Sequence, residues 1–270
     1  MKINSRRRFI KSTILAISSI LAIDMFWFER YIIDWNYFDV SKPNTEAKIK
    51  VVQLSDLHIQ SIKSFHKSIA SKINEMKPDL VCFTGDALDD NNNLSVLNLF
   101  LELLDPSIKK YAILGNWEYW GNVNISELNK IYKSHNCELL INKTSNFTKN
   151  KRTINVIGID DFVGGKANLQ ASTSSLNTKN DALILNHCPQ YFETIQTKEN
   201  TLNANLVLSG HTHGGQITFL GIVPFKPQGS GQFLKGLYGD KLKMYVSKGI
   251  GTSILPIRFG SRSEVAVFDI

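Results

Sequence analysis

Five short motifs in this chain are rich in carboxylate, imidazole and amide side chains, the groups that bind divalent transition metals. The motifs are Asp56-Leu57-His58, Gly85-Asp86, Gly115-Asn116, His187 and Gly210-His211-Thr212-His213. A single pair such as Asp-x-His or Gly-Asp is more often a turn or a helix cap than a metal site. Together, however, the motifs supply ligands for two adjacent ions, and such a pair activates water and hydrolyses phosphate esters or anhydrides.

Each motif follows a run of apolar residues that is typical of a buried strand. The runs are IKVVQLS, LVCFTG, KYAIL, ALILN and NLVLS. In layered α/β proteins, sites form in the crevice beyond the carboxyl ends of the strands, where residues remote in sequence can converge. Asp56 and His58 are two residues apart on an extended segment, so both side chains point to the same face. The motifs therefore predict one site rather than five unrelated turns.

The composition is that of a globular protein without a strong nucleic-acid signal. The 270 residues are 43% hydrophobic and 20% charged, enough for a sizeable core. The net charge is +7, but five basic residues lie among the first eleven, which leaves 26 basic against 24 acidic residues afterwards. We therefore expect no nucleic-acid partner. Three cysteines without a close pair argue against a disulfide framework, and Cys188 is interpreted as a small buried residue rather than a soft metal ligand.

The N-terminus combines basic residues with an apolar stretch. Residues 5–11, SRRRFIK, resemble the twin-arginine export motif, and residues 12–23, STILAISSILAI, are apolar. An ordinary secretion signal or a positive-inside anchor is the alternative. Cleavage sites are poor, and apolar residues continue past Asp24, which favours an uncleaved anchor. We predict association with the bacterial inner membrane and a periplasmic catalytic domain, with a cytoplasm-facing domain as the alternative.

Residues 1–47 are predicted to be this signal or anchor with a linker, and residues 48–270 one catalytic domain. Amphipathic runs that end before prolines predict helices over 65–76 and 94–104. Strand-like segments are more closely spaced in the second half, which indicates additional antiparallel strands. This order fits an α/β fold with two sheets flanked by helices.

Taken in order, with separations of 28, 30, 71 and 24 residues, the motifs resemble those of the calcineurin-like metallophosphoesterases. The segments GHTHGGQI and YVSKGIGTSILPIRFGSRSEVAVF are similar to those of the bacterial membrane-associated or twin-arginine-exported branch. The resemblance covers residues 48–270 and implies a four-layer αββα sandwich of two mixed sheets with a binuclear metal centre. It implies that Asp86 is shared between a first ion held by Asp56, His58 and His213 and a second held by Asn116, His187 and His211.

The resemblance also suggests roles around the ions. Asp86, Asn116 and His187 are the candidate catalytic residues, and the cofactors are two divalent ions of Mn, Fe or Zn, since Ca²⁺ prefers oxygen ligands alone. Asp89 corresponds to a second family acid that orients ligands, or else is a solvated loop residue. Arg258 could bind a substrate phosphate bidentately or form a salt bridge with the C-terminal strands.

One position departs from the family pattern. Many members have histidine after the Gly-Asn pair, whereas this chain has Trp117, followed by Glu118. Indole can donate a hydrogen bond but cannot act as a general acid, a role typically worth about a hundredfold to ten-thousandfold in rate. Because protonation matters most for a basic leaving oxygen, Trp117 favours anhydride or activated aryl ester substrates.

The membrane segment and Trp117 together suggest a small-molecule or lipid-linked phosphate substrate. The best specific candidate is UDP-2,3-diacylglucosamine of the lipid A pathway, which carries a pyrophosphate and acyl chains. UDP-sugars are cytoplasmic, however, so an exported domain would instead act on a phosphodiester or a phospholipid head group. A metal-binding scaffold without catalysis is a further alternative.

Overall fold

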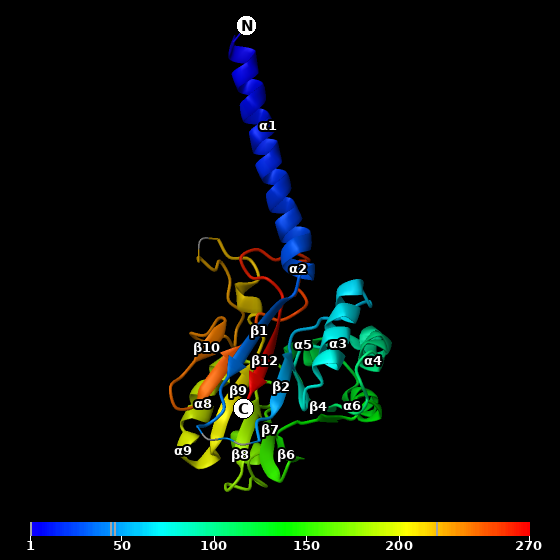
Figure 1. Cartoon of the computed structure of the whole chain (residues 1–270), viewed down its shortest axis with the longest axis vertical. Helices are drawn as coiled ribbons and strands as arrows, with labels where there is room; N and C mark the ends of the chain where they lie inside the picture. The colour runs from blue at the N-terminus through cyan, green and yellow to red at the C-terminus, as the bar shows by residue number, and fades with distance from the viewer. Residues whose placement is uncertain (1, 44, 46, 220) are drawn as a thin grey trace.

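The computed structural model describes residues 2–43, 45, 47–219 and 221–270. Two six-stranded sheets pack face to face with helices on both outer sides, and one long N-terminal helix stands clear of this body (Figure 1). Three groups of buried apolar residues fill the spaces between the four layers. This arrangement confirms the predicted α/β sandwich of two mixed sheets.

The first sheet has the strand order β1-β12-β2-β3-β4-β5. Its strands are β1 (Asp34–Asp39), β2 (Lys50–Leu54), β3 (Leu80–Thr84), β4 (Lys109–Ile113), β5 (Cys137–Leu139) and β12 (Glu264–Asp269). Pairing is parallel from β2 to β5, whereas β12 runs antiparallel to β2. The helices between the parallel strands cover the outer face, and they are α3 (Ser64–Met76), α4 (Leu94–Glu102) and α6 (Ile125–Ser134).

The second sheet has the order β10-β11-β9-β8-β7-β6. Its strands are β6 (Lys143–Lys149), β7 (Arg152–Gly158), β8 (Asp181–Leu185), β9 (Ala204–Ser209), β10 (Gly236–Tyr238) and β11 (Lys243–Val246). The two edge pairs, β6·β7 and β10·β11, are antiparallel, and the central pairs are parallel. Three short helices lie on this side of the sandwich, namely α7 (Leu169–Ser172), α8 (Phe192–Gln196) and α9 (Glu199–Leu202).

Both helices predicted from the amphipathic pattern are present. The one expected over 65–76 is α3, which begins one residue earlier. The one expected over 94–104 is α4, which ends at Glu102. The amides of Leu103 and Leu104 bond to carbonyl oxygens three residues back, so the chain tightens into 3₁₀ geometry there.

The N-terminal segment forms an almost continuous helix. α1 (Lys2–Ile23) continues through a π-helical turn, η1 (Asp24–Phe28), into α2 (Glu29–Tyr31). The stretch Arg6–Tyr31 is 26 residues of helix, exposed over most of its length, and it is long and apolar enough to cross a membrane. The structure therefore shows one N-terminal apolar helix of the kind found in signal sequences and membrane anchors.

The first sheet extends into the stretch that the sequence suggested was a linker. β1 pairs in parallel with β12, with Asp34 opposite Glu264. Trp35 packs toward the outer helices, and Phe38 packs toward the core between the sheets. The strand was missed because charged and amide residues interrupt its apolar pattern.

Phe38 gives a test of this edge strand. Its ring packs 4.9 Å from that of Tyr245 and 5.4 Å from that of Phe268. We expect Phe38→Ala to lower the free energy of unfolding by about 2 kcal/mol, measured by chemical denaturation in detergent. The control is Tyr37→Ala on the opposite, exposed face, for which we expect a change below about 0.5 kcal/mol. Equal effects of the two variants would contradict the placement of β1.

Candidate metal centre

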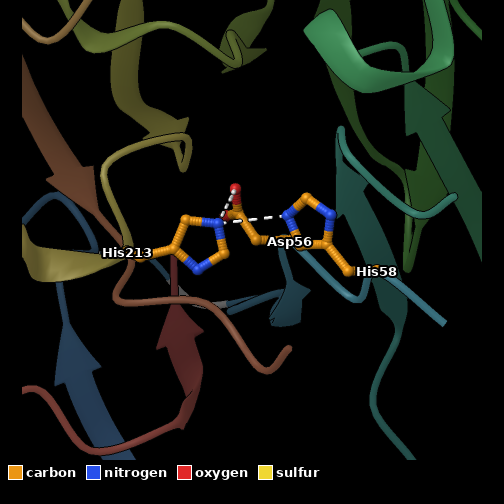
Figure 2. A group of neighbouring side chains, drawn as sticks. All are labelled: Asp56, His58 and His213. Carbon is orange, nitrogen blue, oxygen red and sulfur yellow. Dashed lines mark hydrogen bonds and ion pairs between the residues drawn. The ribbon is translucent and has the colours of Figure 1, made fainter. Parts of the chain in front are cut away.

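The predicted ligands converge at one edge of the sandwich in two buried groups. The first group is Asp56, His58 and His213, and the second is Asp86, His187 and His211. In each group, one ligand atom per residue lies within 4.8 Å of the others. Figure 2 shows the first group, in which two side chains from the loop after β2 point toward a histidine from the loop after β9.

Asp86 connects the two groups. Its Oδ2 atom lies 3.2 Å from His187 Nε2 and 3.8 Å from His58 Nε2, so a single carboxylate oxygen faces both groups. Asn116, the remaining predicted ligand, has its Oδ1 atom 2.8 Å from His211 Nδ1. All seven predicted ligand residues are thus brought together in the structure.

In the second group, one ring nitrogen of each histidine is hydrogen-bonded to a carbonyl oxygen, and the other ring nitrogen faces the remaining ligand atoms. A cation fits between such acceptor atoms. His187 Nδ1 bonds to the Thr84 carbonyl at 2.7 Å, while its buried Nε2 atom has no hydrogen-bond partner among the described residues. His211 Nε2 bonds to the Gln228 carbonyl at 2.7 Å, which leaves a lone pair on Nδ1 opposite Asn116 Oδ1. Carbonyl groups that bind the outer nitrogen fix the tautomer of metal-binding histidines in this way.

The first group shows a similar pattern. His58 Nδ1 lies 2.5 Å from Asp89 Oδ1, and His58 Nε2 lies 3.1 Å from His213 Nε2. Asp89 also accepts a hydrogen bond from Gln60 and is only partly exposed, so the structure places it against His58 rather than free in solvent. This placement favours the orienting role over that of a solvated loop residue.

Burial and neighbouring charges shift the pKa values of the site residues, in some cases in opposite directions. Burial alone would raise the pKa of Asp86, but the adjacent His187 and His58 lower it to about 2. Burial raises the pKa of Asp56 above its ordinary value. Burial, together with the charges of His58 and Arg258, holds the pKa of His213 well below its ordinary range. This shift disfavours the protonated ring of His213, and the neutral ring is the form that binds metals.

The backbone of the site is held in an uncommon conformation. Positive φ angles occur at five of the seven predicted ligands, and these are Asp56, His58, Asp86, His211 and His213. For residues other than glycine such angles are uncommon, and strained backbone of this kind concentrates at functional sites. The loops also meet closely, since a Cβ atom on Gly85, at a φ of +90°, would collide with the His187 ring.

Glu118 holds two of these loops together. Its completely buried carboxylate accepts hydrogen bonds from the backbone amides of Asp86, Ala87, Leu88 and Gly115 at 2.6–3.2 Å. Sequence reasoning placed Glu118 near the site without assigning this role. The carboxylate fixes the loop after β3 against the loop after β4, and so positions Asp86.

Arg258 is also buried and lies behind the first group. Its guanidinium donates to the carbonyl oxygens of Gly251 and Ser261, and Nη2 lies 3.3 Å from His213 Nδ1. It forms no salt bridge with any residue that the structure describes. The structure therefore places Arg258 against His213, away from both pockets that open at the site.

Two pockets open at the site, and Trp117 lies between them. A pocket of about 590 Å³ extends over Asn116 and His211 with mainly apolar walls, among them Trp120 and Phe225. A second, of about 490 Å³, extends from His58 and Asp89 toward the foot of the N-terminal helix. The Trp117 ring stands edge-on to His58, with centroids 5.9 Å apart. Its backbone amide donates to Asp86 Oδ1, which turns Oδ2 toward the histidines.

Two groups that orient the histidine ligands could not be predicted from the side-chain types in the sequence. They are the carbonyl oxygens of Thr84 and Gln228, which orient His187 and His211. Every residue has a carbonyl group, so no residue type marks these positions.

Comparison with known proteins identifies the family. Residues 49–215 match the family model described as calcineurin-like phosphoesterase. The chain belongs to this family. It is therefore a metallophosphoesterase, a metal-dependent hydrolase with two buried Asp/His groups.

The names of two similar bacterial proteins do not give a substrate. This metallophosphoesterase is 32% identical over 249 residues to the uncharacterized metallophosphoesterase Cj0846 of Campylobacter jejuni, covering 86% of this chain but only 62% of that relative. It is 29% identical to the uncharacterized metallophosphoesterase YkuE of Bacillus subtilis, covering 100% and 99% of the two chains. The crystal structure of TT1561 of Thermus thermophilus aligns with a TM-score of 0.52 at 10% identity, covering 76% of this chain and 91% of that one, which supports the fold alone.

Metal content tests the two groups. We expect the purified protein, stripped and reloaded with Mn²⁺ or Zn²⁺, to bind about two ions per chain and to gain thermal stability. His187→Ala should reduce this to about one, because it removes a ligand from one group only. His66→Gln, at a buried histidine on α3 outside both groups, is the control. Two ions retained in His187→Ala would contradict the assignment.

Glu118 can be tested separately from the ligands. Glu118→Gln replaces one acceptor oxygen by an amino group that faces amide donors, so we expect a loss of about 2 kcal/mol in unfolding free energy. Metal affinity should also fall because Asp86 is less well positioned. The control is Glu127→Gln, at an exposed glutamate on α6. Calorimetry and metal titration would measure both effects, and a Glu118→Gln protein as stable as the control would show that the carboxylate is dispensable.

Proposed function

We propose that this metallophosphoesterase hydrolyses a phosphodiester or phosphoanhydride bond with two divalent cations at the strand ends. The observation that carries the proposal is the Asp86 carboxylate, one oxygen of which faces both buried groups. Asp56, His58, Asp86 and His213 would hold one cation, and Asp86, Asn116, His187 and His211 the other. When bound, such a pair supplies charge neutralisation for the phosphate and an activated water.

The protein's own residues orient these ligands. The Thr84 and Gln228 carbonyls fix the tautomers of His187 and His211, and Asp89 fixes His58. Asn116 contributes a neutral amide oxygen, so the site gains a ligand without a further negative charge near an anionic substrate. The arrangement favours pre-organised phosphate binding over side-chain proton transfer.

The surroundings of Trp117 support a choice of substrate. An indole in this position cannot protonate the leaving group, so bonds whose leaving group departs as a stable anion are favoured. The apolar pocket beside it fits acyl chains or another apolar group. We therefore propose a lipid-linked or cell-envelope substrate, with UDP-2,3-diacylglucosamine as the specific candidate if the domain faces the cytoplasm. An exported domain would instead act on a phospholipid head group or a broad range of phosphodiesters.

The direct test is an assay of the metal-loaded, full-length protein in detergent. The substrates are bis-p-nitrophenyl phosphate, p-nitrophenyl phosphate, UDP-2,3-diacylglucosamine and a phospholipid. We expect turnover of the aryl diester and of one of the two lipid substrates, and its loss in Asp86→Ala. A protein that binds two ions but turns over none of the four would support a metal-binding scaffold instead.

Trp117→His tests the leaving-group argument. A histidine could protonate a departing alkoxide, so we expect hydrolysis of an alkyl phosphodiester to rise about tenfold or more, while an anhydride changes little. The kcat values for the two substrates give the comparison. Trp120→His, in the wall of the same pocket, is the control and should show no such preference. Equal gains on both substrates would mean that leaving-group protonation does not limit this enzyme.

A further inference from the structure

Exposed apolar side chains gather at the end of the body from which the N-terminal helix rises. We call this set the apolar rim, and its members are Trp120, Phe219, Ile222, Phe225, Ile254 and Leu255. Ile254 is 82% exposed and Phe225 70%. The red loop before β12 lies next to α2, and the gold loop after β9 lies at the same end of the body (Figure 1); together they carry all of these residues except Trp120. Several large apolar side chains exposed in one region mark an interaction surface.

The rim is fixed to the foot of the helix by hydrogen bonds. The Glu29 carboxylate accepts bonds from the amides of Gly260 and Ser261 at 2.8 Å, and the Met25 carbonyl accepts one from Arg258. The ring of Phe259, in this same loop, stacks on the rim residue Phe219. The foot of the helix is therefore bonded directly to the loop before β12, which in turn contacts Phe219 of the rim.

The length of the N-terminal helix indicates where the apolar core of a membrane would end along it. Residues 9–28 are 20 residues of helix, all exposed except the half-buried residues 24 and 25, and they span about 30 Å, the thickness of a bilayer core. Three arginines, residues 6–8, precede this stretch, Lys11 lies in its first turn and Asp24 near its end, and Trp27 and Glu29 mark the other end, as is typical of an interface. Because Glu29 is bonded to residues 260 and 261, the loop that also carries Ile254 and Leu255 is held at this boundary.

Ile254 provides an independent observation. Its φ angle is +62°, an outlier for a β-branched residue, and its side chain is exposed. The Gln216 side chain holds the turn by bonding to the backbone of Ser253 and Leu255. Strain of this kind costs about 1–3 kcal/mol, and in water the exposed side chain gains no burial that offsets it. Contact with an apolar phase would supply that gain.

We propose that the apolar rim lies in the interface of the membrane that α1 enters, so that the active-site pockets open onto the lipid surface. An amphiphile could then bring its phosphate to the site while its chains stay in the bilayer. The second pocket supports this path, because its lining runs from Arg30, Tyr31 and Lys63 at the helix foot to His58. The two cationic residues at its mouth fit an anionic head group. Substrate delivery rests on the proposed function, whereas membrane contact of the rim does not.

Membrane contact is tested with the full-length protein in phosphatidylethanolamine–phosphatidylglycerol vesicles. An environment-sensitive fluorophore is attached to the new cysteine of Ile222→Cys or of Ile254→Cys. The three native cysteines are buried, so the label should react with the introduced one. The control is Leu99→Cys, at an exposed leucine on α4. We expect a quencher on the lipid tails to lower the two rim signals at least about twofold more than the control signal. Equal quenching at all three sites, or cross-linking between copies without quenching, would overturn the proposal.

Delivery is tested by comparing a vesicle-embedded phosphate ester with a water-soluble one. Phe219 and Ile222 pair with each other and line neither pocket, so Phe219→Asn/Ile222→Asn should leave soluble turnover unchanged. We expect its apparent KM for the embedded substrate to rise about fivefold to tenfold. Leu99→Asn and Leu237→Asn are controls at exposed leucines elsewhere. An unchanged KM would overturn delivery from the membrane, whereas an inactive wild type would count against the proposed function and leave the quenching result intact.

Discussion

The structure depends on one constraint, namely that carboxylates and imidazoles are buried together in a crevice at the strand ends. Asp56, Asp86 and His187 are at most 1% exposed, and the His187 Nε2 atom has no hydrogen-bond partner among the described residues. Burying such groups without compensation is expensive, and a cation bound between them would remove most of that cost. The three apolar cores of the sandwich stabilise the loops that keep the groups together until that happens.

The positions of the predicted ligands in this crevice depend on the backbone conformation as much as on side-chain contacts. Five predicted ligands lie in left-handed conformations, which turn each loop sharply after its strand. Glu118 compensates for part of this irregularity because its carboxylate satisfies four amides that have left regular pairing. A carboxylate adjacent to the metal-binding groups therefore holds the loops together, and its four amide donors compensate for its burial.

The strand-end motifs, the two sheets and the helices α3 and α4 could be predicted because apolar runs, prolines and ligand-type residues are visible in the sequence. The approach of the predicted ligands to one another follows from parallel strands ending at a common edge. β1 could not be predicted, since its pairing with β12 joins segments about 230 residues apart and its polar residues hide the pattern. The carbonyl groups of Thr84 and Gln228, and the packing of Arg258 against His213, depend on tertiary contacts that no local pattern encodes.

The loop that begins at Arg258 contacts two very different parts of the molecule. One side of it binds the foot of the N-terminal helix through Glu29, and the other reaches His213 through Arg258 and Ser261. This loop therefore holds His213 at a fixed distance from the foot of the N-terminal helix. With the helix in a membrane, as proposed, the metal ligands would lie at one fixed distance from the lipid surface, so only a bond at that distance could reach them.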